Sequence, residues 1–391
     1  MIARDGLAKT ETAIAKLSDP TPEDLLALAM TQFLAGIEAG LHDRWTVGHS
    51  QDSILPLFRL PIAPNPNPAP FDPALVETVF GNLDTRMEDA RATLSRIPAE
   101  GDIGLVLRPD DLWFDINGSG SRDEGEAILA VGETFLAQPR DNLDTGVMET
   151  SQLPKIDGIR FDRADVSWLT AYTHLLSGIA DMVRAFQPTP VIDRVMKGRM
   201  AMLEKGIFAP LDGVVSDGGT NSYPNEIDMV AMVLLTLRQQ PVPEFTRSGR
   251  GHFLSMVAEN RRFWTEVAAE TDNDREWIPN SKQTPALGPS FPEGMDVAWL
   301  AVLDDAEKLL KGELLVPYVE FIVGTSRNAA TTGFDLAAWL EDPAPVDLVE
   351  WLHGMGLEPW LRQGPLVTAQ SLTAFEELVS GNGVLFAIWF N

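Results

Sequence analysis

Thr21-Pro-Glu-Asp-Leu-Leu-Ala-Leu-Ala-Met-Thr-Gln-Phe-Leu-Ala-Gly-Ile37 sets the fold class of this chain. A threonine cap, a proline at the first helical position and acid in the first turn are typical of a helix start. The mostly apolar residues that follow extend the helix to about His42. The stretch therefore predicts a long helix that belongs in a helical core.

The same pattern recurs along most of the chain. Amphipathic periodicity predicts further helices at about 73–96, 162–186, 190–204, 225–238, 250–270 and 294–311. Asp162 caps the second of these, and Ile159-Arg-Phe161 before it predicts a short strand. We expect a mainly α, multi-helix globular protein with a few short strands.

Domain organisation is less marked. The 391 residues predict one compact helical unit, with a possible subdivision into 1–150 and 151–391 that no clear linker separates. Phe334–Leu340 is echoed by Val346–Leu352, each with an aspartate that caps a short helix. Two copies do not make a solenoid, so we expect a local helical pair that packs its tryptophans in the core. The apolar run Val384–Phe390 predicts a buried terminal strand.

Composition excludes several partners. The chain carries 57 acidic and 30 basic residues, for a net charge of −27. Nucleic acids need a basic footprint, and anionic lipid would be repelled, so neither is an expected partner. A hydrophobic content of 45% and ten tryptophans indicate a globular protein.

Absent residue types and segments limit the chemistry and the compartment. Because there is no cysteine, disulfides, zinc–thiolate sites, iron–sulfur clusters and cysteine nucleophiles are excluded. We expect no membrane helix, because such a helix needs roughly twenty apolar residues in a row. Met1-Ile-Ala-Arg-Asp5 also lacks the apolar core of a signal peptide. The protein is therefore cytosolic, or a mature chain whose leader has been removed. We favour a periplasmic or extracellular location, where calcium is abundant.

Residues 115–126 carry the clearest chemical signal. They read Asp-Ile-Asn-Gly-Ser-Gly-Ser-Arg-Asp-Glu-Gly-Glu, with a glycine at the sixth position, where a calcium loop turns sharply. Calcium takes six to eight oxygen ligands, and this loop offers them at alternating positions. The expected ligands are Asp115, Asn117, Ser119, the backbone oxygen of Ser121, Asp123 and Glu126, the last one bidentate.

This loop resembles the EF-hand and dockerin class of calcium loops over about a dozen residues, and the rest of the chain resembles no characterised family. Position 8 is Arg122, where paired EF-hands place an apolar residue. The approach, Ile103–Leu107 and Leu112–Phe114, reads as extended chain, whereas the exit after Glu126 is helix-like. The resemblance implies a solitary strand–loop–helix site whose calcium staples the fold and does not switch it. The alternative is an acidic turn that binds nothing.

Other candidate sites are weaker. Asp272, Asp274 and Glu276 are candidates for a second cation site, or for surface ion pairs with Arg261, Arg262 and Arg275. The oxygen-rich loop around Asp212 lacks the glycine of a calcium loop. Of the five histidines, His42 and His49 would share a site only through tertiary packing. His174 lies among apolar neighbours and predicts a hydrogen-bonded core residue.

Two long loops, 206–225 and 277–294, predict the borders of the main cleft. They contain residues suited to stacking and hydrogen bonding: Asn221, Tyr223, Trp277, Asn280 and Gln283. The alternative is that each loop wraps a helix pair and buries its own apolar residues.

These features favour a calcium-binding protein with a structural role or with an unknown protein or small-molecule ligand, and not an enzyme. The alternatives are an extracytoplasmic hydrolase with carboxylate catalysis and a solute-binding protein. A pocket lined by carboxylates with raised pKa values would favour the hydrolase, and an aromatic-lined cleft without them would favour the binder. An aspartate at position 9 leaves the preference between calcium and a lanthanide open.

Overall fold

The computed structural model describes residues 1–49, 58, 60–131, 158–207, 226–286, 292–318 and 331–378. The described part is mostly helical, as expected, with a few short strands in small sheets. The helices are α1 (Ile2–Ala15), α2 (Pro22–Thr46), α3 (Leu75–Leu94), α5 (Arg163–Ala185), α6 (Thr189–Glu204), α7 (Glu226–Leu237), α8 (Pro243–Ala269), α9 (Met295–Lys311), α10 (Leu336–Glu341), α11 (Leu348–His353) and α12 (Gln370–Leu378). The strands are β1 (Leu105–Leu107), β2 (Ile159–Phe161), β3 (Val316–Pro317), β4 (Thr332–Phe334) and β5 (Leu361–Gln363).

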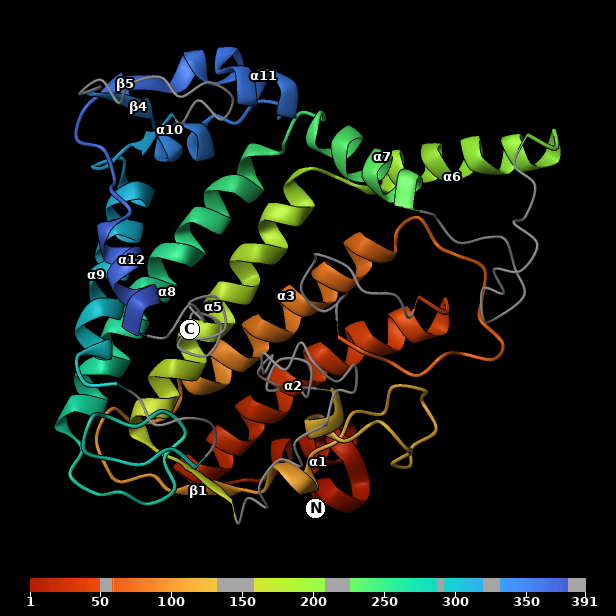
Figure 1. The fold of residues 1–391 in the computed structure, drawn as a ribbon. Coiled ribbons are helices and arrows are strands. Elements are labelled where there is room, and N and C mark those ends of the chain that lie inside the picture. The colour runs from red at the N-terminus through yellow and green to blue at the C-terminus, as the bar shows by residue number, and fades with distance from the viewer. Residues whose placement is uncertain are drawn as a thin grey trace, which may run out of the picture.

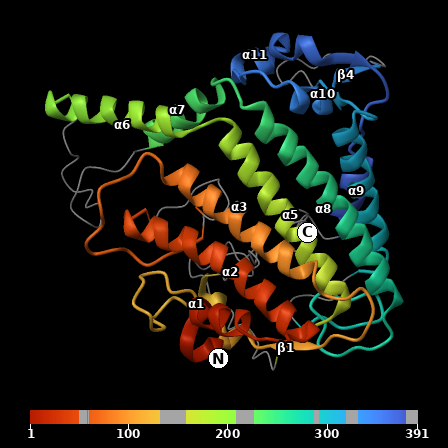
Figure 2. The same ribbon diagram turned by 180° about the vertical axis from the view of Figure 1, so that it is seen from behind.

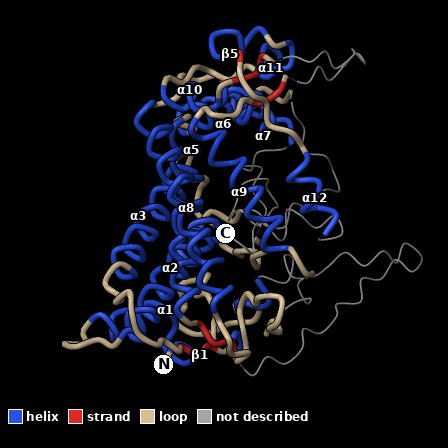
Figure 3. The backbone as a smooth tube through the Cα atoms, turned by 90° about the vertical axis from the view of Figure 1, so that its left-hand side faces the viewer, coloured by secondary structure: helices blue, strands red, loops and turns tan. Residues whose placement is uncertain are grey.

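The long helices form a row in which each packs on the next: α2 on α3, α3 on α5, α5 on α8, α8 on α9 and α9 on α12 (Figure 1). The α6–α7 pair extends away from one end of this row, and α10, α11 and the β3–β4–β5 sheet lie near the same end (Figure 2). The β1 strand lies at the opposite end, near α1 (Figure 3). Helix α1 itself packs on α2.

Small residues set the closest helix contacts. A Cβ on Gly178 of α5 would lie 2.6 Å from the Phe253 ring of α8, and one on Gly249 would lie 3.3 Å from the Gly178 carbonyl. A Cβ on Gly36 of α2 would likewise lie 2.9 Å from Arg86 Cβ of α3. Real Cβ atoms almost never come as close as the contacts at Gly178 and Gly36, and the contact at Gly249 is tighter than most, so these glycines allow the neighbouring helices to approach closely.

The helix starts predicted from the caps at Thr21 and Asp162 are confirmed, whereas the helix predicted from about residue 250 begins earlier, at Pro243. Thr21 and Asp162 each form a capping box, in which the cap and the third helical residue exchange hydrogen bonds. Asp335 and Asp347 cap α10 and α11, the two short helices of the echoed sequence. Trp339 of α10 is 4% exposed and meets the Trp351 ring edge-on at 5.9 Å, so this pair packs as expected.

A short clip of extended chain closes the end of the row opposite the β3–β4–β5 sheet. β1 and β2 pair antiparallel, with Val106 opposite Arg160. Arg160 also forms a parallel bridge with Glu276, which in turn bridges Pro285. This clip joins the loop before α5 to the loop after α8, so it brings distant carboxylates together.

One sequence expectation needs correction. Helix α2 is long and apolar enough to cross a membrane, by length and composition alone. However, 56% of its most apolar window is buried inside the protein, and the core helix of a soluble protein passes the same test.

The expected terminal strand Val384–Phe390 and nearly all of the 206–225 loop lie outside the described residues.

Candidate metal centres

The 115–126 loop is pinned at both ends by the backbone. The Phe114 N–H donates to the Glu126 carbonyl at 2.8 Å, and Trp113 and Ala127 form an antiparallel bridge. Phe114 and Ile116 are each 3% exposed and pack with Leu7 and Leu41. Residues 128–131 are helical. The expected order of extended chain, loop and helix is therefore present.

Glu126 is held in a fixed orientation. The side chain is 4% exposed, and its Oε1 accepts from the Ile116 N–H at 2.9 Å and from the Asn117 N–H at 3.3 Å. Oε2 accepts from the Asp123 N–H at 2.8 Å. A carboxylate has about four lone-pair positions, so these three bonds leave one position, on Oε2, for a cation.

Asp115 is only half satisfied. Its Oδ2 accepts from the Gly120 N–H at 2.9 Å, which is possible because Gly120 has φ of 74°. Its Oδ1 is buried and has no hydrogen-bond partner among the described residues. A buried oxygen without a partner is costly, so it indicates a partner such as an ordered water or an ion.

The other expected ligands converge on one another. Asp123 Oδ2 accepts from Asn117 Nδ2 at 2.7 Å and lies 3.0 Å from the Ser119 hydroxyl, and these bonds lower the Asp123 pKa, that from Asn117 most. The Ser119 hydroxyl lies 2.9 Å from the Ser121 carbonyl oxygen. The structure therefore brings all six sequence-predicted residues into one turn.

Sequence reasoning missed two residues that α2 adds. Glu38 Oε2 accepts from the Asp115 N–H at 2.7 Å, and His42 Nδ1 lies 2.9 Å from the Ile116 carbonyl oxygen. Burial raises the Glu38 pKa, and the charges of Asp115 and Glu126 add to the effect. The two residues are four apart, so they share a face of α2. That spacing is a signal for a shared face, but only the fold shows which loop the face meets.

Arg122 occupies the position that bridges to a second loop in paired EF-hands. Here its guanidinium donates to the Asp110 carbonyl at 2.7 Å, within the approach to the same loop. The bond is exposed and local, so it ties this position to the loop's own neighbour.

A second carboxylate cluster lies at the clip. Asp162, Glu270 and Glu276 each contribute one carboxylate oxygen, and these oxygens lie within 4.8 Å of one another. Asp162 caps the start of α5, Glu270 follows the last residue of α8, and Glu276 lies in the loop beyond. We call these three residues the carboxylate cluster.

Burial raises the proton affinity of the whole carboxylate cluster. It raises the Glu270 pKa to about 8, with the nearby Asp162 charge as the next cause. Burial also raises the pKa values of Asp162 and Glu276, and it raises that of the adjacent Asp165 well above its usual range. Hydrogen bonds oppose this effect in part: the Ala164 N–H donates to Asp162 at 3.0 Å, Gln283 donates to Glu270 at 3.1 Å and the Asp274 N–H donates to Glu276 at 2.9 Å. Arg160 also lies 3.4 Å from Asp162.

This arrangement corrects the sequence reading of the 272–276 segment. Asp272 and Asp274 point outwards, with side chains 51% and 63% exposed, and pair with Arg160 and Arg275. Glu276 is 4% exposed and joins Asp162 and Glu270 instead. The other expected partners are engaged elsewhere: Arg261 pairs with Asp304 and Glu307, and Arg262 pairs with Glu259 and Glu266.

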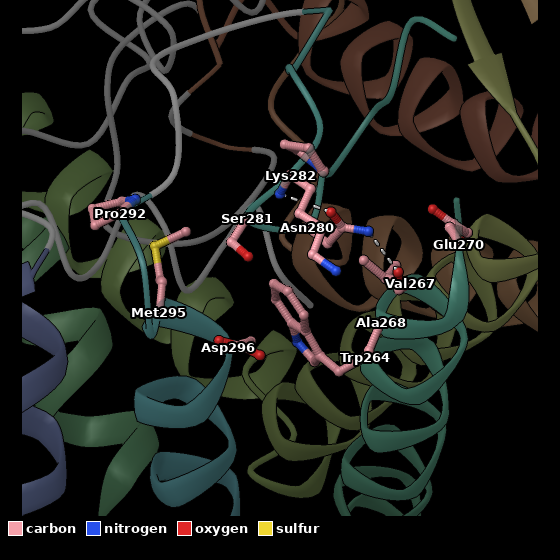
Figure 4. Close-up of a pocket in the computed structure, with 11 residues that line it drawn as sticks. Trp264, Val267, Ala268, Glu270, Asn280, Ser281, Lys282, Pro292, Met295 and Asp296 are labelled. Carbon is pink, nitrogen blue, oxygen red and sulfur yellow. Dashed lines mark hydrogen bonds between the residues drawn. The ribbon is translucent and has the colours of Figure 1, made fainter. Parts of the chain in front are cut away.

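A polar cavity of about 170 Å³ lies beside Glu270 (Figure 4). It is lined by Trp264, Val267, Ala268, Glu270, Pro279, Asn280, Ser281, Lys282, Pro292, Met295 and Asp296. Asn280 is fixed there by a 3.0 Å bond to the Val267 carbonyl. The 277–294 loop thus borders a cavity, but Trp277 packs inside the core against Phe161 and Trp168.

Among the described residues, no histidine belongs to a cluster that could hold a metal ion. His42 lies at the calcium-type loop, whereas His49 lines a different cavity. His174 is hydrogen-bonded, as expected, with its Nδ1 2.9 Å from Nδ1 of His252. Burial lowers the His174 pKa to about 4, so this ring is neutral at pH 7.

Comparison with protein-family models, with curated proteins and with solved structures finds no match to this chain. Function must therefore be inferred from the loop, the clusters and the cavities themselves.

Proposed function

We propose that this protein binds one calcium ion in the 115–126 loop and that the ion acts as a structural staple. The observation that carries the proposal is Asp115 Oδ1, a buried carboxylate oxygen without a hydrogen-bond partner among the described residues. It lies in a loop whose six ligand positions carry oxygen donors and whose closing glutamate is already oriented by three backbone N–H groups.

A bound calcium ion would reduce the electrostatic repulsion among the carboxylates at the loop. Glu38, Asp115 and Glu126 are close enough for the two loop charges to raise the Glu38 pKa. A divalent ion would offset this repulsion and join α2 to the loop. Because backbone hydrogen bonds already hold both ends of the loop, binding would add stability and would leave the shape unchanged. A calcium-rich medium such as the periplasm or the exterior suits such a site.

Calorimetry and thermal unfolding with calcium test the proposal. We expect one bound ion and a melting temperature that rises with calcium. Glu126→Gln should abolish the rise, because it removes the charge of the carboxylate that closes the loop. Glu124→Gln is the matched control, because Glu124 is an exposed acid in the same loop at a non-ligand position. No heat and no melting shift at millimolar calcium in the wild type would refute the proposal.

The choice between calcium and a lanthanide is a separate measurement. Asp123 adds a direct carboxylate at position 9, and extra charge in the ligand set favours a trivalent ion. Terbium luminescence, competed with calcium, reports which ion the loop prefers. We expect terbium luminescence with the wild type and not with Glu126→Gln.

The second candidate function is a hydrolase that uses carboxylate acid–base chemistry. The observation in its favour is Glu270, whose pKa of about 8 keeps it protonated at neutral pH on the wall of the polar cavity. It would donate a proton to a leaving group. Chromogenic esters, glycosides and phosphates test for turnover, with Glu270→Gln as the inactive variant and the outward-facing Asp274→Asn as the control. No turnover of any substrate by the wild type would count against this candidate.

A further inference from the structure

A second, larger cavity of about 360 Å³ lies where α3, α5, α6 and α7 meet. Its volume is within the usual range for small-molecule sites. It is lined by His49, Phe58, Phe71, Leu75, Val76, Ile179, Met182, Val183, Phe186, Pro188, Ile192, Met229, Met232, Val233, Thr236, Leu237 and Phe253. We call it the apolar cavity, because only His49 and Thr236 among these lining residues carry polar side chains.

The walls of the apolar cavity come from three hydrophobic clusters. One is built around Val79, Phe80 and Leu83 of α3, and a second around Ile192, Met196 and Met232 of α6 and α7. The third contributes Phe186 and Phe253. The cavity lies where these clusters meet. Three of its lining residues are methionines, whose unbranched side chains adapt to the shape of a bound chain.

One end of the apolar cavity carries the polar side chain of His49. His49 Nε2 is buried and has no hydrogen-bond partner among the described residues. Burial, and then the charge of Arg44, lower the His49 pKa to about 4, so the ring is neutral at pH 7. A neutral imidazole can carry its hydrogen on Nε2 and donate it to a ligand.

A positive charge lies behind this end. Arg44 is fully buried, and its guanidinium carbon lies 5.7 Å from the centre of the Phe58 ring. The Phe58 ring centre lies 5.7 Å from that of His49, so the three side chains form one unit. The charge of Arg44 acts on His49, because it contributes to the lowered imidazole pKa, and the same charge would favour an anionic head group there.

We propose that the apolar cavity binds a single-chain fatty acid, with the acyl chain between α5, α6 and α7 and the carboxylate against His49 Nε2. Apolar walls without acidic residues remove the chain from water, and the single donor fixes the direction of the molecule. The proposal is independent of calcium, because the 115–126 loop contributes no residue to this cavity.

Calorimetry with palmitate on delipidated full-length protein tests the proposal. We expect one palmitate bound per chain. Met229→Trp fills the cavity and should reduce the affinity at least tenfold. Val230→Trp is the matched control, because Val230 is the next residue on α7, is 57% exposed and does not line the cavity. Equal binding by wild type and Met229→Trp would overturn the assignment to this cavity.

The head-group position is tested with a second pair of variants. His49→Leu should weaken palmitate by roughly tenfold to a hundredfold, the usual effect of a hydrogen bond to a charged group. It should leave methyl palmitate unchanged, and His49→Gln should retain part of the palmitate affinity. Equal loss of both ligands in His49→Leu would overturn the carboxylate position.

A measurement on the wild-type chain guards against variants that fail to fold. With the methionine methyl groups labelled with carbon-13, palmitate should shift the resonances of Met182, Met229 and Met232. The resonances of Met256 and Met355, which do not line the cavity, should stay in place. No shift at any of the three lining methionines would overturn the proposal. Sedimentation provides a further test. If a second copy of the chain, and not palmitate, covered the apolar cavity, the proposal would also be overturned.

Discussion

Two glutamates illustrate how the same side chain is held under opposite constraints. Glu126 is almost fully buried, yet its carboxylate accepts three backbone N–H groups. Glu270 has one amide donor and lies beside two other carboxylates. Burial among like charges raises the Glu270 pKa and favours its protonated form. The two glutamates therefore differ in what holds them: backbone N–H groups orient Glu126, whereas Glu270 keeps a proton at neutral pH.

Glu270 predicts a specific pH dependence of stability. Its pKa is raised in the folded state, so the folded protein binds more protons than the unfolded chain between about pH 4.5 and 8. The contribution of Glu270 to stability is therefore most favourable below this range and is lost as the pH rises through it. Urea unfolding in a calcium chelator at pH 5 and pH 8 measures this effect.

Glu270→Gln is the comparison. Because glutamine has no proton to lose, the variant should gain stability relative to the wild type when the pH is raised from 5 to 8. Asp274→Asn removes an exposed acid nearby and should follow the wild type at both pH values. A stability difference between Glu270→Gln and the wild type that is constant with pH would contradict the raised pKa.

At the scale of the element, packing of α5 against α8 depends on glycine. Gly178→Ala would place a Cβ 2.6 Å from the Phe253 ring, so one helix must shift. We expect a loss of about 1–3 kcal/mol in the free energy of unfolding, the usual cost of overpacking. Chemical denaturation measures it.

Gly198→Ala in α6 is the matched control. A Cβ there meets no atom within 4 Å, and the residue is exposed. Alanine in an open helical position should increase stability by about 0.5–1 kcal/mol, because it restricts the unfolded chain. If both variants lost stability to the same extent, the close approach of α5 and α8 would not be the cause.

Helix starts were predictable because their signals are local. Thr21 and Asp162 predict the starts of α2 and α5 because a cap and its partners lie within one helical turn, and the structure confirms both caps. Helix α1 was not predicted, and it contains a kink at Gly6, where φ is 72° and the helical pattern is broken. Helix α12 was not predicted either, so the sequence patterns missed the interrupted first helix and a short helix near the end of the described residues.

At the scale of the whole molecule, the sequence could not show which elements meet. Residues 115–126 could be read as a calcium-type loop from spacing alone, but the contribution of Glu38 depends on how α2 packs. The carboxylate cluster joins Asp162 to Glu270 and Glu276, which are far away in the chain. Such contacts arise from tertiary packing, and no local pattern encodes them.

The calcium staple predicts an unchanged overall shape. Small-angle scattering with calcium and with chelator should give the same radius of gyration, while the melting temperature differs. The physical reason is that the loop ends are fixed by backbone bonds with or without the ion. A clear change in radius on addition of calcium would indicate a switch and would contradict the structural role.

The clip around Arg160 also bears on how the chain folds. Within the row, α2 and α3, and α8 and α9, follow each other in the sequence, whereas the clip pairs β2 with β1 on one side and with the segment after α8 on the other. Each pairing closes a long loop, and the chain loses conformational entropy on closure before the new contact stabilises it. Folding speed falls as such non-local contacts increase. The clip is therefore expected to form late, after the helices have assembled, and to set the pace of the final folding step.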